Sequence, residues 1–365
     1  MMRIVGVLFA LALGGFAGAQ TLDIYVIDVE GGNATLFVTP AHDSLLIDTG
    51  NAGAVASVRD AGRILQAMRD AGVEQIDHLI ITHWHGDHFG GLAELASKTT
   101  IKEFIDHGPN VQPGELADNF LKTTYPGLYA KAKHTVAKPG DKILMAGLDV
   151  RVVASAGETI KTPLPGAGKA NPYCANYKPG DNNAEDPQSV GIHVAFGKFR
   201  TVHLGDLTKN KEFELMCPTN RIGSVDLYLT SHHGLAKSGS PALVQGLQPR
   251  VVVMNNGTRK GGEPETFRVL HELLGLEDLW QLHWSYNVGL ENTPATFVAN
   301  IEDNATLAAV LAPPPQAPGA RGGPGGFGGA AHSPAYLIKI SAQQDGTFTV
   351  TNTRNGFSKT YRSRP

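Results

Sequence analysis

The sequence has few cysteines, few charged residues and no excess of positive charge, and each shortage excludes a class of protein. Its 365 residues include two cysteines, too few for a disulfide-stapled small fold or for an all-cysteine zinc site. Charged residues make up 18% and the formal net charge is −3, so the chain has no basic footprint for nucleic acid. A G-x-S-x-G segment is also missing, which argues against a serine nucleophile on a strand-to-helix turn. With 42% hydrophobic residues, the chain can nevertheless bury a large core.

The first 19 residues have the composition of an export signal. Arg3 gives a positive start, Ile4 to Phe16 is apolar, and Ala17-Gly18-Ala19 has the small-x-small form of a cleavage site. A buried helix or a membrane anchor is the alternative, but the stretch is short for a membrane span. Removal of residues 1–19 leaves 30 basic and 34 acidic residues, a net charge of −4. We therefore expect an exported protein, periplasmic or extracellular, with no membrane contact after cleavage.

Export changes the interpretation of Cys174 and Cys217. In an oxidising compartment the two thiols could pair and tie a long loop to the chain after Asp206. Two free buried thiols are the alternative. Neither cysteine is expected to be catalytic.

Seven of the 43 glycines lie in one segment near the C-terminus, where much of the glycine excess is concentrated. Residues 313–334 are rich in glycine and proline and have almost nothing to bury, so a flexible loop is expected, with His332 as a solvated side chain. Two alternating apolar runs then flank Asp345-Gly346, a strong hairpin signal. We therefore divide the chain into a signal (1–19), a main domain (20–312), the loop (313–334) and a hairpin extension packed on the main domain (335–365).

The main domain alternates strands and helices, which predicts sheets packed together and covered by helices. No internal repeat is visible. Expected strands are 22–29, 34–38, 44–47, 78–81, 150–154, 191–195, 201–204, 225–230 and 251–255. Expected helices are 60–71, 92–97, 209–216, 241–246 and 265–274.

The histidines concentrate in a motif directly after the strand 78–81. His83-x-His85-x-Asp87-His88 places four potential metal ligands in six residues. Imidazole nitrogens and carboxylate oxygens suit zinc, or manganese when more oxygens take part. Residues of opposite parity point in different directions, so His83 and His85 can serve one ion, and Asp87 and His88 a neighbouring one.

Two further strand ends carry matching residues. Asp206 follows the strand 201–204 and is well placed to bridge two cations, although an Asp at this point also makes an ordinary cap for the following helix. His232-His233-Gly234 follows the strand 225–230. One histidine of this pair can bind a metal while the other contacts substrate or a ligand.

In these motifs the sequence resembles the metallo-β-lactamase superfamily, from about Thr21 to Leu270. It is most similar to the extracytoplasmic hydrolase domain of ComEC-type competence proteins and their secreted relatives. Besides the motifs above, the resemblance is carried by the segments 28–34, 46–50, 76–82, 182–183, 189–190, 204–206 and 225–226.

The resemblance implies an αββα sandwich of two mixed sheets flanked by helices, with a dinuclear metal site at one edge. It implies that the metal ligands are His83, His85, Asp87, His88, Asp206 and one histidine of the 232–233 pair, which we assign as His232. Asp48 would lie beneath the site. We expect Asp87 and His233 to be catalytic, with Asp87 taking a proton from the attacking water. The cofactors would be two divalent ions, zinc first and manganese as the alternative.

One departure from the family pattern concerns the first metal. Many members have a further histidine ligand before the bridging aspartate, whereas the matching region 182–189 has none. His193 and His203 lie nearby but within expected strands. We therefore expect that metal to be weakly bound or completed by water.

The substrate is the least determined part of the prediction. A phosphodiester or related phosphorylated substrate comes first because of the family resemblance, with Asn183, Lys237 and Ser238 as tentative substrate-binding residues. The negative net charge argues mildly against long nucleic acid. A lactone or β-lactam hydrolase is the second hypothesis, and a secreted metal-binding protein with a structural site is the third.

Overall fold

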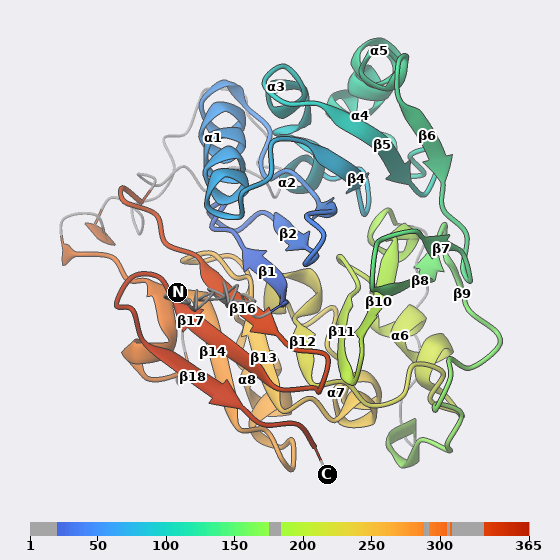
Figure 1. The fold of residues 1–365 in the computed structure, drawn as a ribbon, viewed down its shortest axis with the longest axis vertical. Helices are drawn as coiled ribbons and strands as arrows, with labels where there is room; N and C mark the ends of the chain where they lie inside the picture. The colour runs from blue at the N-terminus through green and yellow to red at the C-terminus, as the bar shows by residue number, and fades with distance from the viewer. Residues whose placement is uncertain are drawn as a thin grey trace, which may run out of the picture.

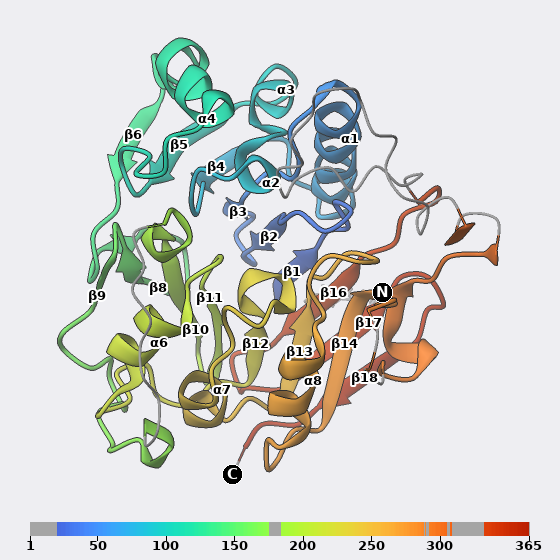
Figure 2. The same cartoon turned by 180° about the vertical axis from the view of Figure 1, so that it is seen from behind.

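The computed structural model describes residues 20–174, 184–287, 289, 292–304, 307–308 and 332–364. The predicted signal, Asn183 and most of the predicted glycine-rich loop lie outside these residues. Within them, the chain forms two mixed sheets packed face to face, with helices on both outer surfaces (Figures 1 and 2). The predicted αββα architecture is confirmed. No helix in the described ranges is both long and apolar enough to cross a membrane.

The first sheet joins the two ends of the chain. Its central strands come from the first third of the sequence, and three C-terminal strands extend it beyond β1. In spatial order it contains β18 (Ser358–Tyr361), β17 (Phe348–Asn352), β16 (Ile338–Ala342), β1 (Leu22–Val26), β2 (Thr35–Val38), β3 (Ser44–Ile47), β4 (Ile76–Ile80), β5 (Ile101–Asp106) and β6 (Lys133–Val136).

The second sheet is built from the middle of the chain. Its strands β11 to β15 run parallel, as expected for strands joined by crossover segments. In spatial order it contains β15 (Val298–Asn300), β14 (Asp278–His283), β13 (Val251–Met254), β12 (Leu227–Leu229), β11 (Phe199–His203), β10 (Gly191–Phe196), β8 (Asp149–Ser155) and β7 (Lys142–Ile143), with β9 (Glu158–Thr159) paired to β8.

Three apolar clusters hold the four layers together. The inner one lies between the sheets and includes Ile24 and Val253, together with Ile340 and Phe348 from the C-terminal strands. A second cluster packs α1 (Ala54–Asp70), α2 (Gly86–Phe89), α3 (Leu92–Ala96), α4 (Glu115–Asn119), the π-helical turn Phe120–Thr124 and α5 (Tyr125–Tyr129) on the first sheet. A third packs α6 (Lys209–Met216), α7 (Pro241–Leu247) and α8 (Pro264–His271) on the second. The C-terminal strands therefore belong to the main core.

The strand directions bring several loops to one edge of the sandwich. β3 and β4 are parallel, and so are β11, β12 and β13, so within each group the carboxyl ends meet at one edge. β10 is antiparallel to β11, with Ile192 opposite His203, so the residues before β10 lie beside those after β11. A hydrogen bond of 3.0 Å from Asn255 Nδ2 to Asn33 Oδ1 joins the edges of the two sheets.

Several elements differ from the predicted ones for identifiable reasons. Helix α1 begins six residues before the predicted start at position 60. The prediction missed this first part because Val55 and Val58 are exposed apolar residues that obscure the amphipathic pattern. Strand β14 escaped prediction because Gln281 and His283 are buried within it and interrupt its apolar run. The edge strand β18 is mostly polar and was not predicted beyond the hairpin.

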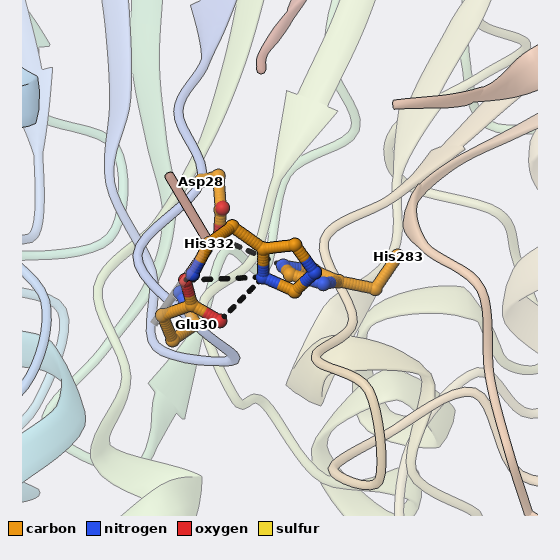
Figure 3. A group of neighbouring side chains, drawn as sticks. All are labelled: Asp28, Glu30, His283 and His332. Carbon is orange, nitrogen blue, oxygen red and sulfur yellow. Dashed lines mark hydrogen bonds and ion pairs between the residues drawn. The ribbon is translucent and has the colours of Figure 1, made fainter. Parts of the chain in front are cut away.

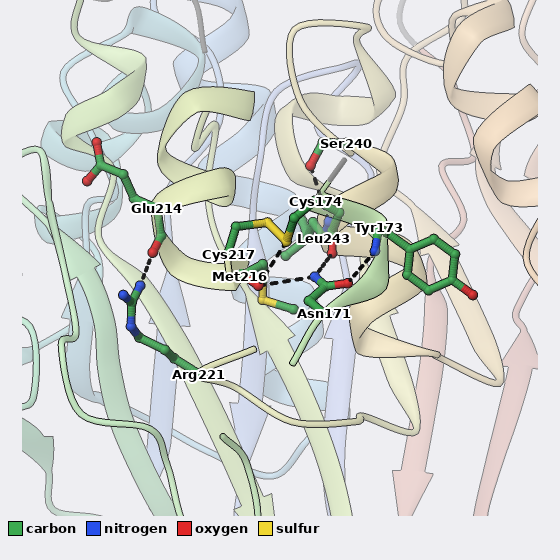
Figure 4. The surroundings of a disulfide bond; sticks show 10 residues. Asn171, Tyr173, Cys174, Glu214, Met216, Cys217, Arg221, Ser240 and Leu243 are labelled. Atoms are coloured by element: carbon green, nitrogen blue, oxygen red, sulfur yellow. Dashed lines mark hydrogen bonds between the residues drawn. A yellow bond between two sulfur atoms is a disulfide. The ribbon is translucent and has the colours of Figure 1, made fainter. Parts of the chain in front are cut away.

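A disulfide joins Cys174 to Cys217 at the end of α6 (Figure 4). Beside it, Asn171 Nδ2 donates to the carbonyl oxygens of Met216 at 3.1 Å and Ala242 at 2.9 Å. The covalent bond and the amide together fasten the segment before Cys174 to the helical layer on the second sheet.

Candidate metal centre

The turn after β4 supplies four side chains to a buried cluster. His83 and His85 face each other, with Nε2 of His83 3.0 Å from Nδ1 of His85. Asp87 and His88 lie on α2, and Oδ2 of Asp87 is 3.3 Å from Nε2 of His88. The tight return beneath them requires Gly90, where a Cβ atom would lie 1.9 Å from the backbone nitrogen of Ala52. The structure thus separates the four residues into the two pairs expected from their parity.

Asp206 lies between the two pairs. Its Oδ2 is 3.9 Å from Nε2 of His83 and 3.3 Å from Nε2 of His88. The approach depends on Gly205, whose φ is +56° and whose added Cβ would lie 2.8 Å from the Cβ of Thr82. The predicted bridging position is therefore where this carboxylate lies.

Both histidines of the 232–233 pair reach the centre. They have φ of 54° and 55°, a left-handed conformation that costs energy for residues other than glycine and is typical of functional sites. Nε2 of His232 is 3.4 Å and Nε2 of His233 is 3.5 Å from Oδ2 of Asp206. His233 was expected to be catalytic and not a ligand, but its Nε2 also lies 3.3 Å from Asp87 Oδ2 and 3.3 Å from His88 Nε2. It therefore joins the ligand group of Asp87, His88 and Asp206.

Asp186 completes the other group and was missed in the sequence. Its Oδ1 lies 2.9 Å from Nδ1 of His85 and 3.6 Å from Nε2 of His83. The expectation that region 182–189 offers no ligand is therefore wrong, because a carboxylate stands where a histidine was sought. The strand order could have indicated this residue. Because β10 is antiparallel to β11, an acidic residue shortly before β10 lies beside Asp206, which follows β11.

The neighbouring Glu185 fixes this segment to the turn that carries His83 to His88, called the histidine turn below. Its Oε1 accepts from the backbone nitrogen of Trp84 at 3.0 Å and lies 2.5 Å from Nε2 of His107. Its other oxygen accepts from the backbone nitrogen of Val111 at 2.9 Å. Asp186 is thus held next to the histidines by its own chain neighbour.

Asp48 lies beneath the centre, as expected. Its Oδ2 is 2.7 Å from Nδ1 of His88 and accepts from Asn33 Nδ2 at 2.8 Å, while its Oδ1 accepts from the backbone nitrogen of Thr82 at 2.7 Å. A carboxylate on Nδ1 orients the ring and leaves Nε2 free to act as a ligand. His203 lies behind this group, with Nε2 3.2 Å from Asn33 Nδ2, and burial lowers its pKa to about 4.

The charges in the centre are strongly coupled. Burial alone would raise the pKa of Asp87, but Lys260 and His88 hold it well below its usual range. Burial likewise opposes the charged form of Asp206, but His232 and His88 keep its pKa well below the usual range. Burial lowers the pKa of His83 well below its ordinary value, together with the nearby charge of His88. At neutral pH the carboxylates are therefore ionised and His83 is neutral, the states in which these groups bind metals.

Lys260 is a residue of the centre that the sequence reading did not identify. Its Nζ forms an ion pair with Oδ2 of Asp87, and the side chains of Lys260, Asp87 and His85 are 21%, 23% and 31% exposed. The other ligand side chains are at most 9% exposed. The open side of the centre is therefore the side of these three residues.

The donor set fits two metal ions. Two pairs of imidazole nitrogens, one in each group, approach within 3.3 Å of each other, and nitrogens that converge in this way can share a metal ion. Eight side chains converge in overlapping groups, which are connected by Asp186 and Asp206. His83, His85, Asp186 and Asp206 would hold one ion, and Asp87, His88, His233 and Asp206 the other, with His232 near the first.

The three residues predicted to bind substrate lie in different surroundings. Ser238 is buried and does not face the open side: its Oγ donates to the carbonyl oxygen of Leu207 at 2.7 Å and lies 3.2 Å from Nδ1 of His232, so it orients that ring. Its predicted role in substrate binding is therefore wrong. Lys237 is exposed, and its role stays a prediction. Asn183 lies outside the described residues.

Comparison with known proteins agrees with this fold. Residues 27–160 match the family model of the metallo-β-lactamase superfamily, a segment that includes the histidine turn. A hydroxyacylglutathione hydrolase of Rhodopseudomonas palustris is 30% identical over 117 residues, 32% of this chain and 39% of that protein. The lactamase-like protein adaB of Aspergillus niger is 32% identical over 145 residues, 40% of this chain and 36% of that protein. The chain spans less than half the length of these relatives.

Among solved structures, a metal-dependent hydrolase of the β-lactamase superfamily aligns over 74% of this chain and 99% of its own, with 13% identity and a TM-score of 0.42. Residues 27–160 are therefore similar to the metallo-β-lactamase superfamily, and the two mixed sheets flanked by helices have the architecture of the metallo-β-lactamase fold.

Proposed function

We propose that the protein is a metal-dependent hydrolase that uses water activated at a dinuclear centre. The single observation that carries this proposal is the pair of ligand groups that share Asp206. A structural metal site is closed by its ligands, whereas this centre has an open side at His85, Asp87 and Lys260. That opening disfavours the alternative of a metal-binding protein without activity.

Two divalent cations in such a centre would lower the pKa of water towards neutrality and polarise the bond under attack. The side chains around them have separate tasks. Asp87 is ionised and partly exposed, so it can accept a hydrogen bond from the attacking water and then its proton. Asp48 keeps His88 in one orientation, and Ser238 does the same for His232.

For the substrate we propose a phosphodiester or a related phosphorylated compound. Three carboxylates, Asp87, Asp186 and Asp206, would face two divalent cations, so the loaded centre would carry a net positive charge. Lys260 adds a further positive charge at the open side. This balance favours an anionic substrate, and the resemblance to ComEC-type domains points the same way. The negative charge of the whole chain favours a small substrate over long nucleic acid.

A carboxyl-derivative substrate is the second candidate. It is supported by the relative named as a hydroxyacylglutathione hydrolase, which is 30% identical to this chain over 117 residues. A thioester, lactone or β-lactam would use the same activated water but would not need Lys260.

For the metals we propose zinc, with manganese as the alternative. The replacement of a histidine by Asp186 adds an oxygen ligand and moves the preference towards manganese. We also propose that the protein is exported to the periplasm or the exterior. The disulfide between Cys174 and Cys217 supports this, because such bonds persist in oxidising compartments.

A substrate panel on protein of known metal content tests the proposal. Bis(p-nitrophenyl) phosphate, S-lactoylglutathione and nitrocefin are offered to the wild type, to His85→Ala and to His271→Ala, which alters an exposed histidine on α8. We expect diester turnover in the wild type and His271→Ala, and none in His85→Ala. Turnover of only the carbonyl substrates would replace the first candidate with the second. No turnover by a protein carrying two metals would contradict the hydrolase proposal for all three substrate classes.

A further inference from the structure

A second cluster of potential ligands lies outside the metal centre (Figure 3). Asp28, Glu30, His283 and His332 each offer one atom within 4.8 Å of the others. Nε2 of His283 is 2.7 Å from Oδ1 of Asp28, and Nδ1 of His332 is 3.0 Å from Oε2 of Glu30. The two imidazole rings lie with their centroids 4.8 Å apart. His332 was predicted to be a solvated loop residue, but its side chain is only 8% exposed, so that prediction is wrong.

The topology explains why four distant segments meet here. Asp28 and Glu30 follow β1, and His283 ends β14. β16 is antiparallel to β1, with Val26 opposite Ile338, so the residues before β16 come back to the end of β1. His332 is brought to the cluster by this pairing, and the nearby Glu302 follows β15.

Both carboxylates contact Arg63 as well as a histidine, and Oε1 of Glu30 is shared between Arg63 and His332, because it also accepts from the backbone nitrogen of His332 at 2.7 Å. Nη1 of Arg63 is 3.1 Å from Oδ2 of Asp28, and Nη2 is 2.9 Å from Oε1 of Glu30. The inward oxygens are Oδ1 of Asp28, which also accepts from the backbone nitrogen of Glu30 at 2.7 Å, and Oε2 of Glu30. Metal-binding carboxylates are commonly held by outer hydrogen bonds of this kind.

Glu302 occupies the corresponding place behind the two rings. Its Oε1 lies 3.0 Å from Nε2 of His332 and 3.9 Å from Nδ1 of His283, the nitrogens turned away from Asp28 and Glu30. It also accepts from the hydroxyl of Thr258. A carboxylate behind a histidine fixes the tautomer and raises the basicity of the opposite nitrogen, as in carboxylate–histidine–zinc triads.

The cluster needs positive charge that its permanently charged side chains do not supply. Asp28, Glu30 and Glu302 carry three negative charges against one on Arg63, and the side chains of Asp28, His283 and Glu302 are at most 1% exposed. Oε2 of Glu302 has no hydrogen-bond partner among the described residues. With neutral imidazoles the cluster is left with two excess negative charges. One divalent cation, or two protons on the rings, would balance them.

We propose that Asp28, Glu30, His283 and His332 form a further metal site that binds one divalent cation, with zinc favoured by two nitrogen and two oxygen ligands. The ligand atoms are Nε2 of His283, Nδ1 of His332 and the inward oxygens of the two carboxylates. Arg63 and Glu302 orient them. The ion ties the start of the C-terminal strands to the loop after β1 and to the end of β14.

The balance of charges shows how the cluster is held together before a metal binds. Burial lowers the pKa of a histidine, but Asp28 and Glu302 raise that of His283 to about 10, and Glu30 and Glu302 raise that of His332 to about 9. In the absence of a metal, two protons would therefore hold the cluster. Zinc displaces such protons when a preformed ligand set is present.

The test counts zinc per chain in matched proteins. Wild type and His332→Gln are stripped with a chelator, equilibrated with a small excess of zinc, separated from free zinc and measured by plasma mass spectrometry. Glutamine keeps side-chain hydrogen bonding to the carboxylates but removes the ligand nitrogen. We expect the variant to hold one zinc fewer than the wild type, whatever the content of the main centre. His271→Ala, on the exposed face of α8, should match the wild type.

A second variant protects the test against loss of folding. Glu30→Gln alters the most exposed ligand of the cluster, at 16%, and should also lose one zinc. Equal zinc in the wild type and in a folded variant would overturn the proposal. The count is independent of turnover, so failure of either proposal is visible separately.

Discussion

The main metal centre and the cluster of Asp28, Glu30, His283 and His332 use the same edge of the sandwich in opposite ways. In the main centre, one short turn supplies four of the eight side chains, so the site is detectable from the local sequence. In the second cluster every histidine comes from a different, distant segment, and no local motif exists. Ligands can therefore be brought together by the directions of the strands as well as by a short motif. Only the short motif can be recognised in the sequence.

The largest expected effect is a loss of activity and of metal in the main centre alone. Asp206→Asn removes the carboxylate shared by both ligand groups of the main centre. We expect it to lower kcat/KM by about a thousandfold or more, the scale of losing electrostatic stabilisation by metal ions. Zinc counts should fall by up to two per chain while the ion of the second cluster remains. A folded Asp206→Asn variant with wild-type turnover would refute the assignment of the centre.

A smaller effect is expected from the support beneath the centre. Asp48→Asn keeps the size of the side chain but weakens its hold on Nδ1 of His88. Loss of such a partner costs about 10- to 100-fold in metal affinity or activity. Competition with a chromophoric chelator would measure the affinity, and excess zinc should restore most of the turnover. If excess zinc restores nothing, Asp48 has a role beyond positioning His88.

Lys260 lies in a loop that serves both regions, because Thr258 in the same loop bonds Glu302 of the second cluster. Lys260→Met removes the positive charge at the open side while retaining the apolar stem. We expect KM for a phosphodiester to rise about tenfold, because a tenfold change corresponds to the loss of roughly 1.4 kcal/mol of charge interaction. We expect kcat to be less affected. Lys131→Met, at an exposed lysine to which no role in substrate binding is assigned, is the matched control. Equal effects of the two substitutions would remove Lys260 from substrate binding.

The last expected effect is on stability in acid and not on turnover. His193 on β10 lies in neither region, and burial together with Arg200 lowers its pKa to about 4. Since its folded pKa is below the unfolded value, its neutral form supports folding above about pH 6.5, and that support is lost as pH falls towards 4. The scale is on the order of 2–3 kcal/mol for a shift of this size.

His193→Gln should therefore flatten the loss of unfolding free energy between pH 6.5 and pH 4, measured by urea denaturation of chelator-treated protein. His271→Gln on the surface is the control. An unchanged slope in His193→Gln would mean that acid lability comes from the two metal-binding regions.

Much of this molecule was predictable because its strands are short, apolar and followed by polar loops. The alternation around Asp345-Gly346 gave the C-terminal hairpin, and the spacing of His83, His85, Asp87 and His88 gave the centre. Asp186 was missed because only a histidine was sought at that place. Lys260 was missed because nothing local distinguishes a lysine in a glycine-rich loop.

The second cluster could not be derived without the strand order. His332 joins it only because β16 pairs with β1, and that pairing spans most of the chain. His283 is a polar residue in a buried strand, which sequence patterns treat as an interruption. Such residues become informative only when their neighbours across the sheet are known.

The pairing of β1 with β16 also has a consequence for the order in which the protein is made. Leu22, near the start of the chain, lies opposite Ala342, close to its end, and both belong to the inner apolar cluster. β1 is synthesised long before β16, so its outer edge stays uncovered until β16 has been made. Pairings of such long sequence separation form slowly and expose apolar edges in the interval. Folding of this domain should consequently finish only after β16 has left the ribosome, and C-terminal truncation before β16 should yield an aggregating product.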